Sequence, residues 1–461
     1  FGSSLFFCAE VLPQWNLQTV EPPRVSVAML RRSRRAALAL RFSLAIPLAR
    51  HTAYVPLPEK LAVGATLLYP HNGRARVVLA GEDEAASKGL KIAVVGASGS
   101  VGRQIAMSVA SKRRHFAGQG PVTLQFVGRR DRHSLSILIG LCSELRDAFA
   151  EYCPNFEIVE DIEAVKAHII VMAAGASLST QYRTRKHLVR ANADLFGEYA
   201  SGLVERNRNA LVMVVSNPVE FGVDSFIKAG FARDRVLGTG SFIDSMRFQR
   251  EIAAQIGVPQ QQVTGLVIGV HGLGMVPCWS TVRLAALNAN QETIDALEKL
   301  KEEGLARGWD LTAMRKQAYT IREMALRGDA LAALSLVNRQ PPDSRAALRR
   351  YLSFFAGPVY PRIGIGEGVC SMIMKILSGR DSITAAQFAV NGEFFGIKNA
   401  IGVPVVVSGN GVRLAQSVKL APVEIEGLKA AAEEAKSIHF AAEASQLFQK
   451  LVKRKDRKSS Q

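Results

Sequence analysis

A single histidine stands in the stretch GVHGLGMVPCWS (269–280), directly after the apolar residues Leu266, Val267 and Ile268. An apolar run that ends in glycine predicts a buried strand, so His271 is expected at a strand end, among residues that are not bulky. An imidazole there can give or take a proton near neutral pH, which makes His271 a candidate acid–base residue. The alternative is an ordinary histidine of the hydrophobic core.

A glycine-rich loop, GASGSVG, follows the apolar segment KIAVV and precedes a helical pattern. Such glycines let the backbone approach a pyrophosphate, whose charge is favoured at the N-terminus of the next helix. A tight turn without a ligand is the alternative. The positions expected to contact a dinucleotide are Gly96, Ser98, Gly99, Val101 and Gly102.

The next apolar segment, VTLQFVG, ends at Gly128 and is followed by Arg129 and Arg130. An acidic residue commonly ends this strand and binds the ribose hydroxyls of NAD. Two guanidinium groups would instead bind the 2′-phosphate of NADP. Asp131 and Asp161 are out of register for the acidic position. The sequence therefore favours NADP, with NAD, or a solvated loop and relaxed cofactor choice, as the alternative.

The elements that must position these residues follow a regular alternation. Apolar strand-like segments at 91–96, 122–128, 168–175 and 210–218 alternate with helical patterns at 101–111, 134–152 and 185–206. This alternation predicts right-handed βαβ units and a doubly wound parallel sheet. We therefore expect an α/β protein with a Rossmann-type dinucleotide-binding domain at 91–235.

The pattern changes from about Val236, where longer amphipathic helices and antiparallel-looking strands begin. VPVVVSGNGVRLA (403–415) contains a Gly-Asn-Gly hairpin signal, and a long helical pattern follows it. An α+β catalytic domain is expected at 236–461. Residues 1–90 are expected to form an N-terminal extension.

That extension contains the stretch MLRRSRRAALALRFSLAIPLAR, at 29–50, which is rich in Arg, Ala, Leu and Ser. Its composition is typical of an organellar presequence, a basic amphipathic helix that is later removed. We therefore expect the mature protein in the mitochondrion or the plastid. A basic arm on a cytoplasmic protein is the alternative.

The net charge of +18 is unevenly distributed over the 461 residues. Residues 29–58 hold six arginines and no acidic residue, and residues 450–458 hold six basic residues and one acidic residue. These two segments supply eleven of the eighteen charges, so the remainder gives little support for a nucleic-acid partner. No apolar run is long enough for a membrane span, and the five cysteines lack metal-ligand spacing. We expect no membrane and no metal.

Five segments, in order, resemble the lactate/malate dehydrogenase family: GASGSVG, TRKHLVRANADLF, VVSNPVE, GTGSFIDSMRFQRE and GVHGLGMVPCWS. The match runs from about Lys91 to Leu451, and its last three segments are together more specific than any one alone. The resemblance implies hydride transfer between a nicotinamide cofactor and a short 2-oxo or 2-hydroxy acid. It also implies a homodimer or homotetramer.

The resemblance makes His271 the proton donor and acceptor, and Asp244 the carboxylate that fixes its tautomer. Arg247 lies three residues after Asp244 on the same helix face and is expected to bind the substrate carboxylate. Asn217 would hydrogen-bond the substrate oxygen, and Arg185 would polarise the carbonyl when its loop closes. A surface ion pair, a turn residue and a helix cap are the corresponding alternatives. Further cofactor contacts are expected from Gly175, Asn192, Val215 and Asn217.

The sequence departs from the family at the substrate loop, GASLSTQYRTR. Malate enzymes carry a second arginine shortly before the loop arginine, where this chain has Leu178 or Ser179. Arg183 is the extra cation nearby, and it could bind a dicarboxylate or be solvated. Leu273 replaces a family acid after the histidine.

The stretch 300–360 is longer than in the family and resembles nothing we can place; it could serve as a partner-binding surface. RIGIGEGV (362–369) stands where the family has a wall of the substrate pocket, and its glycines predict room for a larger substrate.

The preferred interpretation is reversible reduction of oxaloacetate to malate with NADP. A lactate-like or broader 2-hydroxy-acid dehydrogenase is one alternative. A family member that serves as a structural subunit of a larger assembly, through 300–360 and the basic tail, is another.

Overall fold

The computed structural model describes residues 65–68, 76–79, 89–176, 185–285, 289–355 and 362–437. The chain divides into two units, Phe1–Pro58 and Glu59–Gln461, and the described residues all belong to the second. The predicted targeting segment at 29–50 and Arg183 lie outside the described residues.

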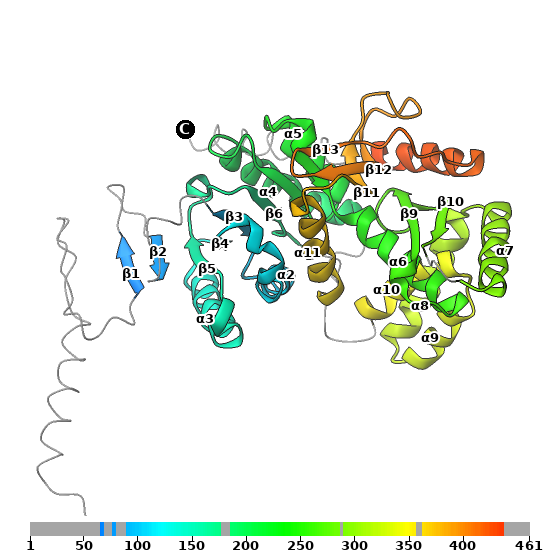
Figure 1. The fold of residues 1–461 in the computed structure, drawn as a ribbon, viewed down its shortest axis with the longest axis horizontal. Helices are drawn as coiled ribbons and strands as arrows, with labels where there is room; N and C mark the ends of the chain where they lie inside the picture. The colour runs from blue at the N-terminus through cyan, green and yellow to red at the C-terminus, as the bar shows by residue number, and fades with distance from the viewer. Residues whose placement is uncertain are drawn as a thin grey trace, which may run out of the picture. The chain divides into compact units, whose positions relative to one another are not determined.

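A parallel sheet forms the first half of the described unit (Figure 1). Its strands lie in the order β5-β4-β3-β6-β7-β8, which is the doubly wound arrangement predicted from the alternating pattern. The residues are buried almost throughout, as expected of strands covered on both faces. The strands are β3 (Leu90–Val95), β4 (Val122–Val127), β5 (Asn155–Val159), β6 (Ile169–Met172), β7 (Leu211–Val214) and β8 (Val236–Gly238).

Four helices connect these strands: α2 (Ser100–Ser111), α3 (Arg132–Ala148), α4 (Arg185–Val204) and α5 (Val219–Lys228). Helices α2 and α3 lie on one face of the sheet, and α4 and α5 lie on the other (Figure 1). Short 3-10 turns occupy Arg113–Gln119, Ala150–Tyr152, Ile162–Ala164, Arg233–Arg235 and Gln260–Gln262.

Two features of this sheet were not predicted. Strand β5 was missed because its segment NFEIV is short and carries an acidic residue. Strands β1 (Ala65–Leu68) and β2 (Arg76–Leu79) form an antiparallel pair, and β2 adds antiparallel to β5 at the sheet edge. Part of the extension predicted at 1–90 therefore belongs to the sheet.

Antiparallel strands continue the same sheet beyond β8, in the order β8-β11-β12-β9-β10, with β13 paired to β12. They are β9 (Val263–Gly269), β10 (Met275–Leu284), β11 (Ser382–Ala389), β12 (Ala400–Ser408) and β13 (Gly411–Leu414). The Gly-Asn-Gly signal lies at the β12–β13 turn, as predicted. Helices α6 (Gly240–Ile256) and α11 (Ile363–Leu377) pack here, and residues 422–437 are helical.

The unplaced stretch at 300–360 is a group of four helices beside α6 and β10 (Figure 1). They are α7 (Gln291–Arg307), α8 (Leu311–Leu326), α9 (Ala330–Asn338) and α10 (Pro342–Phe355). Helices α8, α9 and α10 share a small apolar core of Met314, Ala318, Ile321, Ala333, Val337 and Leu348.

The cysteines of the described residues are free thiols, and Cys142, Cys278 and Cys370 are buried. Burial raises the pKa of the Cys142 and Cys370 thiols to about 12, so both stay protonated as small apolar side chains. No described helix has the length and apolar character needed to cross a membrane.

Candidate active site

The glycine-rich loop lies between β3 and α2, where its backbone leaves no room for side chains. Gly96 has φ +85°, and a Cβ there would lie 2.6 Å from Cα of Ala174. A Cβ on Gly102 would lie 2.2 Å from the carbonyl oxygen of Gly96. Gly99 is the N-cap of α2 and makes no side-chain bond, and the first turn of α2 holds no acidic residue. These features fit a pyrophosphate at the helix N-terminus.

The end of β4 is packed against the start of α3. A Cβ on Gly128 would lie 2.3 Å from Oγ of Ser134, so the acidic side chain common at this position does not fit without a rearrangement. The Ser134 hydroxyl donates to Ser98 Oγ over 2.9 Å and accepts from the backbone N–H of Arg129 over 3.0 Å. Ser98 therefore links the glycine-rich loop to the end of β4.

Arg129 and Arg130 lie at this strand end, and each is paired with a neighbouring carboxylate. Arg130 donates to Asp161 over 2.6 Å and to the backbone oxygen of Glu160 over 3.1 Å. Arg129 lies 3.3 Å from Asp131, which also caps α3. The two aspartates that the sequence placed out of register are thus the ion-pair partners of these arginines, because their loops fold back on the strand end.

Asn192 holds two loops together rather than facing open space. Its buried side chain accepts from the N–H of Ala176 over 2.7 Å and donates to the carbonyl oxygens of Ala176 and Asn217, over 2.9 and 2.7 Å. Gly175, with φ +140°, has room for no Cβ beside this amide. Asn192 therefore positions the segments after β6 and β7, which end beside the glycine-rich loop; Val215 is half-buried in the second.

His271 and Asp244 are brought together by the β9–β10 turn and helix α6, as the resemblance predicted. Nδ1 of His271 lies 2.7 Å from Oδ2 of Asp244, and Nη1 of Arg247 donates to the other carboxylate oxygen over 2.9 Å. Burial would raise the pKa of Asp244, but the charge and hydrogen bond of His271, and the charges of Arg247 and Arg350, hold it well below its usual range. Asp244 is therefore ionised and fixes the imidazole.

Two residues that the sequence did not single out also position His271. The backbone N–H of His271 donates to Glu220 at the start of α5, over 2.7 Å. A Cβ on Gly240 would lie 2.6 Å from the imidazole, so only glycine at the start of α6 leaves space for the ring. Neither residue has a local signal, because both meet His271 through the fold.

The glycines around His271 serve the backbone turn. Gly269 and Gly272 have φ +84° and +109°, a region that favours glycine. A Cβ on Gly274 would lie 2.9 Å from Cβ of Val270. The sequence predicted His271 among residues that are not bulky, and in the structure the backbone of the turn itself requires these glycines.

Arg247 borders a cavity of about 140 Å³ that is also lined by Ile243, Met246, Arg250, Gln260 and Gly364. Gly364 is open, but a Cβ on Gly366 would lie 2.6 Å from Gln104, and one on Gly368 would lie 2.9 Å from Ile243. The glycines of RIGIGEGV therefore mostly allow α11 to pack closely on α2 and α6, and only Gly364 leaves the room that the sequence suggested.

The helices at 300–360 contact the turn that carries His271. The indole N–H of Trp309 donates to the carbonyl oxygen of Leu273 over 3.1 Å, and Leu273 packs against the core of α8–α10. The leucine that replaces a family acid is thus apolar because it packs against the inserted helices.

The remaining predicted substrate residues are only partly described. Arg185 is the first residue of α4, and Asn217 lies in the turn before α5. Within the described residues, no group of three or more His, Cys, Asp or Glu side chains could hold a metal ion.

Residues 90–238 match the family described as the lactate/malate dehydrogenase NAD-binding domain. The L-lactate dehydrogenase of Latilactobacillus sakei is 26% identical over 298 residues, 64% of this chain and 80% of that protein. The L-2-hydroxycarboxylate dehydrogenase (NAD(P)(+)) of Methanocaldococcus jannaschii is 25% identical over 350 residues, 75% of this chain and 96% of that protein.

Solved structures agree on the fold. Malate dehydrogenase from Cryptosporidium parvum has a TM-score of 0.59 at 20% identity, over 77% of this chain and 99% of that one. Lactate dehydrogenase from Eimeria maxima, solved with NADH and oxamate, has a TM-score of 0.55 at 19% identity, over 80% and 97%.

The glycine-rich loop, the histidine–aspartate pair and these matches define an NAD(P)-dependent 2-hydroxy-acid dehydrogenase. Within that class, the chain is similar to the lactate/malate dehydrogenases, whose NAD-binding domain its residues 90–238 match.

Proposed function

We propose that the chain catalyses the reversible reduction of oxaloacetate to malate, with NADP as the favoured cofactor. The observation that carries the proposal is the Asp244 carboxylate, which contacts His271 through one oxygen and Arg247 through the other. One buried carboxylate thereby orients both the proton donor and the group that would bind the substrate's carboxylate.

In the forward direction, a bound nicotinamide supplies a hydride to the carbonyl carbon. The carbonyl oxygen then needs one proton, which the imidazolium of His271 gives from the nitrogen that faces away from Asp244. Asp244 remains ionised and stabilises the imidazolium before transfer. Arg247 would hold the carboxylate next to the reacting carbon, Asn217 would hydrogen-bond the oxygen, and Arg185 would polarise the carbonyl.

The cofactor would lie along the glycine-rich loop, with its pyrophosphate at the N-terminus of α2. Gly128 offers no carboxylate to the adenosine ribose, whereas Arg129 and Arg130 lie beside it with exposed side chains. A 2′-phosphate would compete with Asp131 and Asp161 for these guanidinium groups. This favours NADP moderately rather than strictly, and the Methanocaldococcus relative is described with NAD(P)(+).

A lactate-like or broader 2-hydroxy-acid dehydrogenase is the alternative, favoured by the relatives named L-lactate dehydrogenase. Arg183 separates the two proposals. If it binds a second carboxylate, Arg183→Ala lowers activity with oxaloacetate and spares activity with pyruvate.

The cellular setting is also a proposal. The basic segment at 29–50 supports import into a mitochondrion or plastid, which a fluorescent fusion of residues 1–90 tests directly. A homodimer or homotetramer is proposed from the family, and light scattering coupled to size exclusion measures it.

The test of function offers NADPH and NADH, each against oxaloacetate and pyruvate, to a chain that starts near His51. We expect the fastest turnover with NADPH and oxaloacetate. Turnover with pyruvate alone would favour the lactate-like alternative. No turnover in any pairing, with His271→Asn indistinguishable from the parent, would overturn the enzyme proposal.

A further inference from the structure

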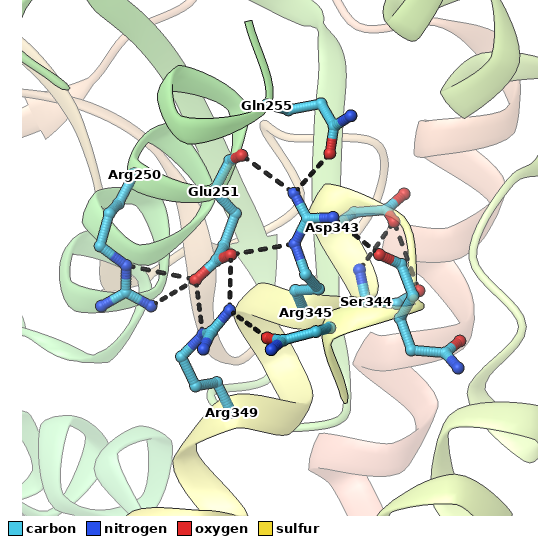
Figure 2. A network of polar contacts seen from close by, with 9 residues as sticks. Arg250, Glu251, Gln255, Asp343, Ser344, Arg345 and Arg349 are labelled. Carbon is cyan, nitrogen blue, oxygen red and sulfur yellow. Dashed lines mark hydrogen bonds and ion pairs between the residues drawn. The ribbon is translucent and has the colours of Figure 1, made fainter. Parts of the chain in front are cut away.

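Helix α10 of the inserted group is fixed to α6 by a buried carboxylate (Figure 2). Glu251 of α6 accepts from Arg345 over 3.0 Å and from Arg349 over 2.9 Å, and its side chain is only 5% exposed. Arg250 also donates to Glu251, over 2.6 Å. These contacts set the position of α10 along α6.

The direction of α10 follows from the same contacts. Arg345 also reaches Gln255, one turn further toward the C-terminus of α6, over 2.9 Å, whereas Arg349 reaches only as far as Glu251 on that helix. The two helices therefore run antiparallel here, with each residue advancing 1.5 Å. The turn of α10 that begins at Arg350 then lies beside the turn of α6 that carries Arg247 and Asp244.

Electrostatics agree with this placement. The charge of Arg350 contributes to lowering the pKa of Asp244, after the larger effect of His271. The pKa of Arg247 is lowered chiefly by burial, and Arg350 adds to that effect. The guanidinium of Arg350 thus lies close enough to act on both residues of the site.

Arg350 has no anionic partner of its own among the described residues. Its Nε is buried and has no hydrogen-bond partner, and its guanidinium carbon lies 5.4 Å from the centre of the Tyr351 ring. Arg349 and Arg345, by contrast, are both bound to Glu251. A buried donor without a partner is costly, so an anion that binds there is favoured.

The charges around Asp244 are unbalanced. This carboxylate contacts Arg247 and the imidazole of His271, which is positive when it carries the proton to be transferred, and the charge of Arg350 also acts on it. A substrate with one carboxylate would neutralise Arg247 and leave Arg350 uncompensated. A substrate with two carboxylates would neutralise both.

We propose that Arg350 binds the far carboxylate of a dicarboxylate 2-oxo acid and so determines substrate specificity. The inference rests on the proposed function of the same site. It assigns to the inserted helix α10, and not to Arg183, the cation that the substrate loop lacks at Leu178 and Ser179, so Arg183→Ala should leave the oxaloacetate-to-pyruvate ratio unchanged.

The test compares Arg350→Gln and Arg350→Lys with a control, Arg339→Gln, which removes an exposed arginine at the end of α9. For each, kcat/KM is measured with oxaloacetate and with pyruvate, and unfolding is followed in urea. Arg350→Gln removes the cation that would pair with the far carboxylate of oxaloacetate. It should therefore lower the ratio of kcat/KM for oxaloacetate to kcat/KM for pyruvate about 100-fold, mainly through KM for oxaloacetate. Arg339→Gln should leave the ratio unchanged.

Arg350→Lys keeps the charge but loses the forked geometry, so it should lower the same ratio by roughly 10-fold. This variant serves as the test if the glutamine variant does not fold. Equal losses with both substrates, or an unchanged ratio, would overturn the inference while leaving the dehydrogenase proposal intact. A parent without turnover on any 2-oxo acid would overturn both.

Discussion

The parallel half of the sheet and the inserted helices α7–α10 differ in how deeply the ion pairs at β4 and at α10 are buried. In the parallel half, apolar strands fill the interior, and the ion pairs at the end of β4 have exposed guanidinium groups. Where the inserted group meets α6, the buried Glu251 of α6 accepts from Arg345 and Arg349 of α10 (Figure 2). The buried Asp343 of α10 accepts from Arg307 and from the indole of Trp279. Removing one of these exposed arginines should therefore cost little stability, and removing one of these buried carboxylates should cost much.

The same contrast applies to function. The parallel half offers a backbone cradle for a cofactor, made of glycines and a helix terminus. The inserted helices bring the charge of Arg350 toward Asp244 and a small apolar core against Leu273. Changes in the two regions should thus separate cofactor binding from substrate binding.

The largest expected effect is the loss of activity when the proton donor is replaced. His271→Asn should lower kcat/KM with oxaloacetate by roughly 10²–10⁴-fold, the contribution of general acid–base catalysis. NADPH binding, measured by its fluorescence, should stay within about threefold of the parent, because the cradle belongs to the parallel half. A loss of cofactor binding as large as the loss of activity would contradict this separation.

The next effect tests the buried charge that fixes α10. Glu251→Gln should lower the free energy of unfolding by about 3–5 kcal/mol, because arginines are left without their carboxylate. Urea denaturation measures it. The matched control is Glu298→Gln on α7, where the exposed Glu298 pairs with Lys301. This control should lower the free energy of unfolding by less than about 1 kcal/mol. Similar values for the two variants would remove the contrast between buried and exposed pairs.

A smaller effect is expected at the exposed arginines of the parallel half. Arg130→Ser should lower kcat/KM for NADPH about 10-fold, by the loss of a charge-assisted hydrogen bond, and should change that for NADH little. Arg132→Ser, on the neighbouring exposed position, is the control. If both cofactors respond alike, the NADP preference is wrong.

The smallest effect concerns pH. The folded-state pKa of Glu251 is lowered, because hydrogen bonds from Arg349 and Arg250 outweigh the burial that would raise it. The stability that Glu251 contributes is therefore present above the ordinary glutamate pKa of about 4.3 and is lost as pH falls through the lower folded value. The free energy of unfolding is measured from about pH 6 to about pH 3, a range that spans the ordinary glutamate pKa. It should fall less steeply in Glu251→Gln than in the parent. Parallel curves would contradict the assignment.

Much of the fold was predictable because its signals are local. The buried strands include KIAVV, VTLQFV and the segments before Gly175 and Asn217. Each is a short apolar run, and these runs alternate along the sequence with helical patterns. Strand β5 was missed because Glu157 interrupts an already short apolar run; in the fold, Lys91 and Gln125 bind that carboxylate. Helices α7–α10 could be placed only by contacts between residues far apart in sequence.

The site divides in the same way. His271, Asp244 and Arg247 were named from motifs that resemble a family, and the structure brings them together. Gly240, Glu220 and Arg350 were not named, because each becomes important only through a partner on another element. The pairing of Arg130 with Asp161 was missed for the same reason.

The most direct test of the account follows a label from the cofactor into the product. NADPH deuterated at both C4 positions is incubated with oxaloacetate and the parent chain, and the malate is analysed by NMR. We predict deuterium at the carbon that bears the hydroxyl, and far less of this labelled malate with His271→Asn over the same time. Malate without deuterium at that carbon, or no malate at all, would contradict hydride transfer at this site.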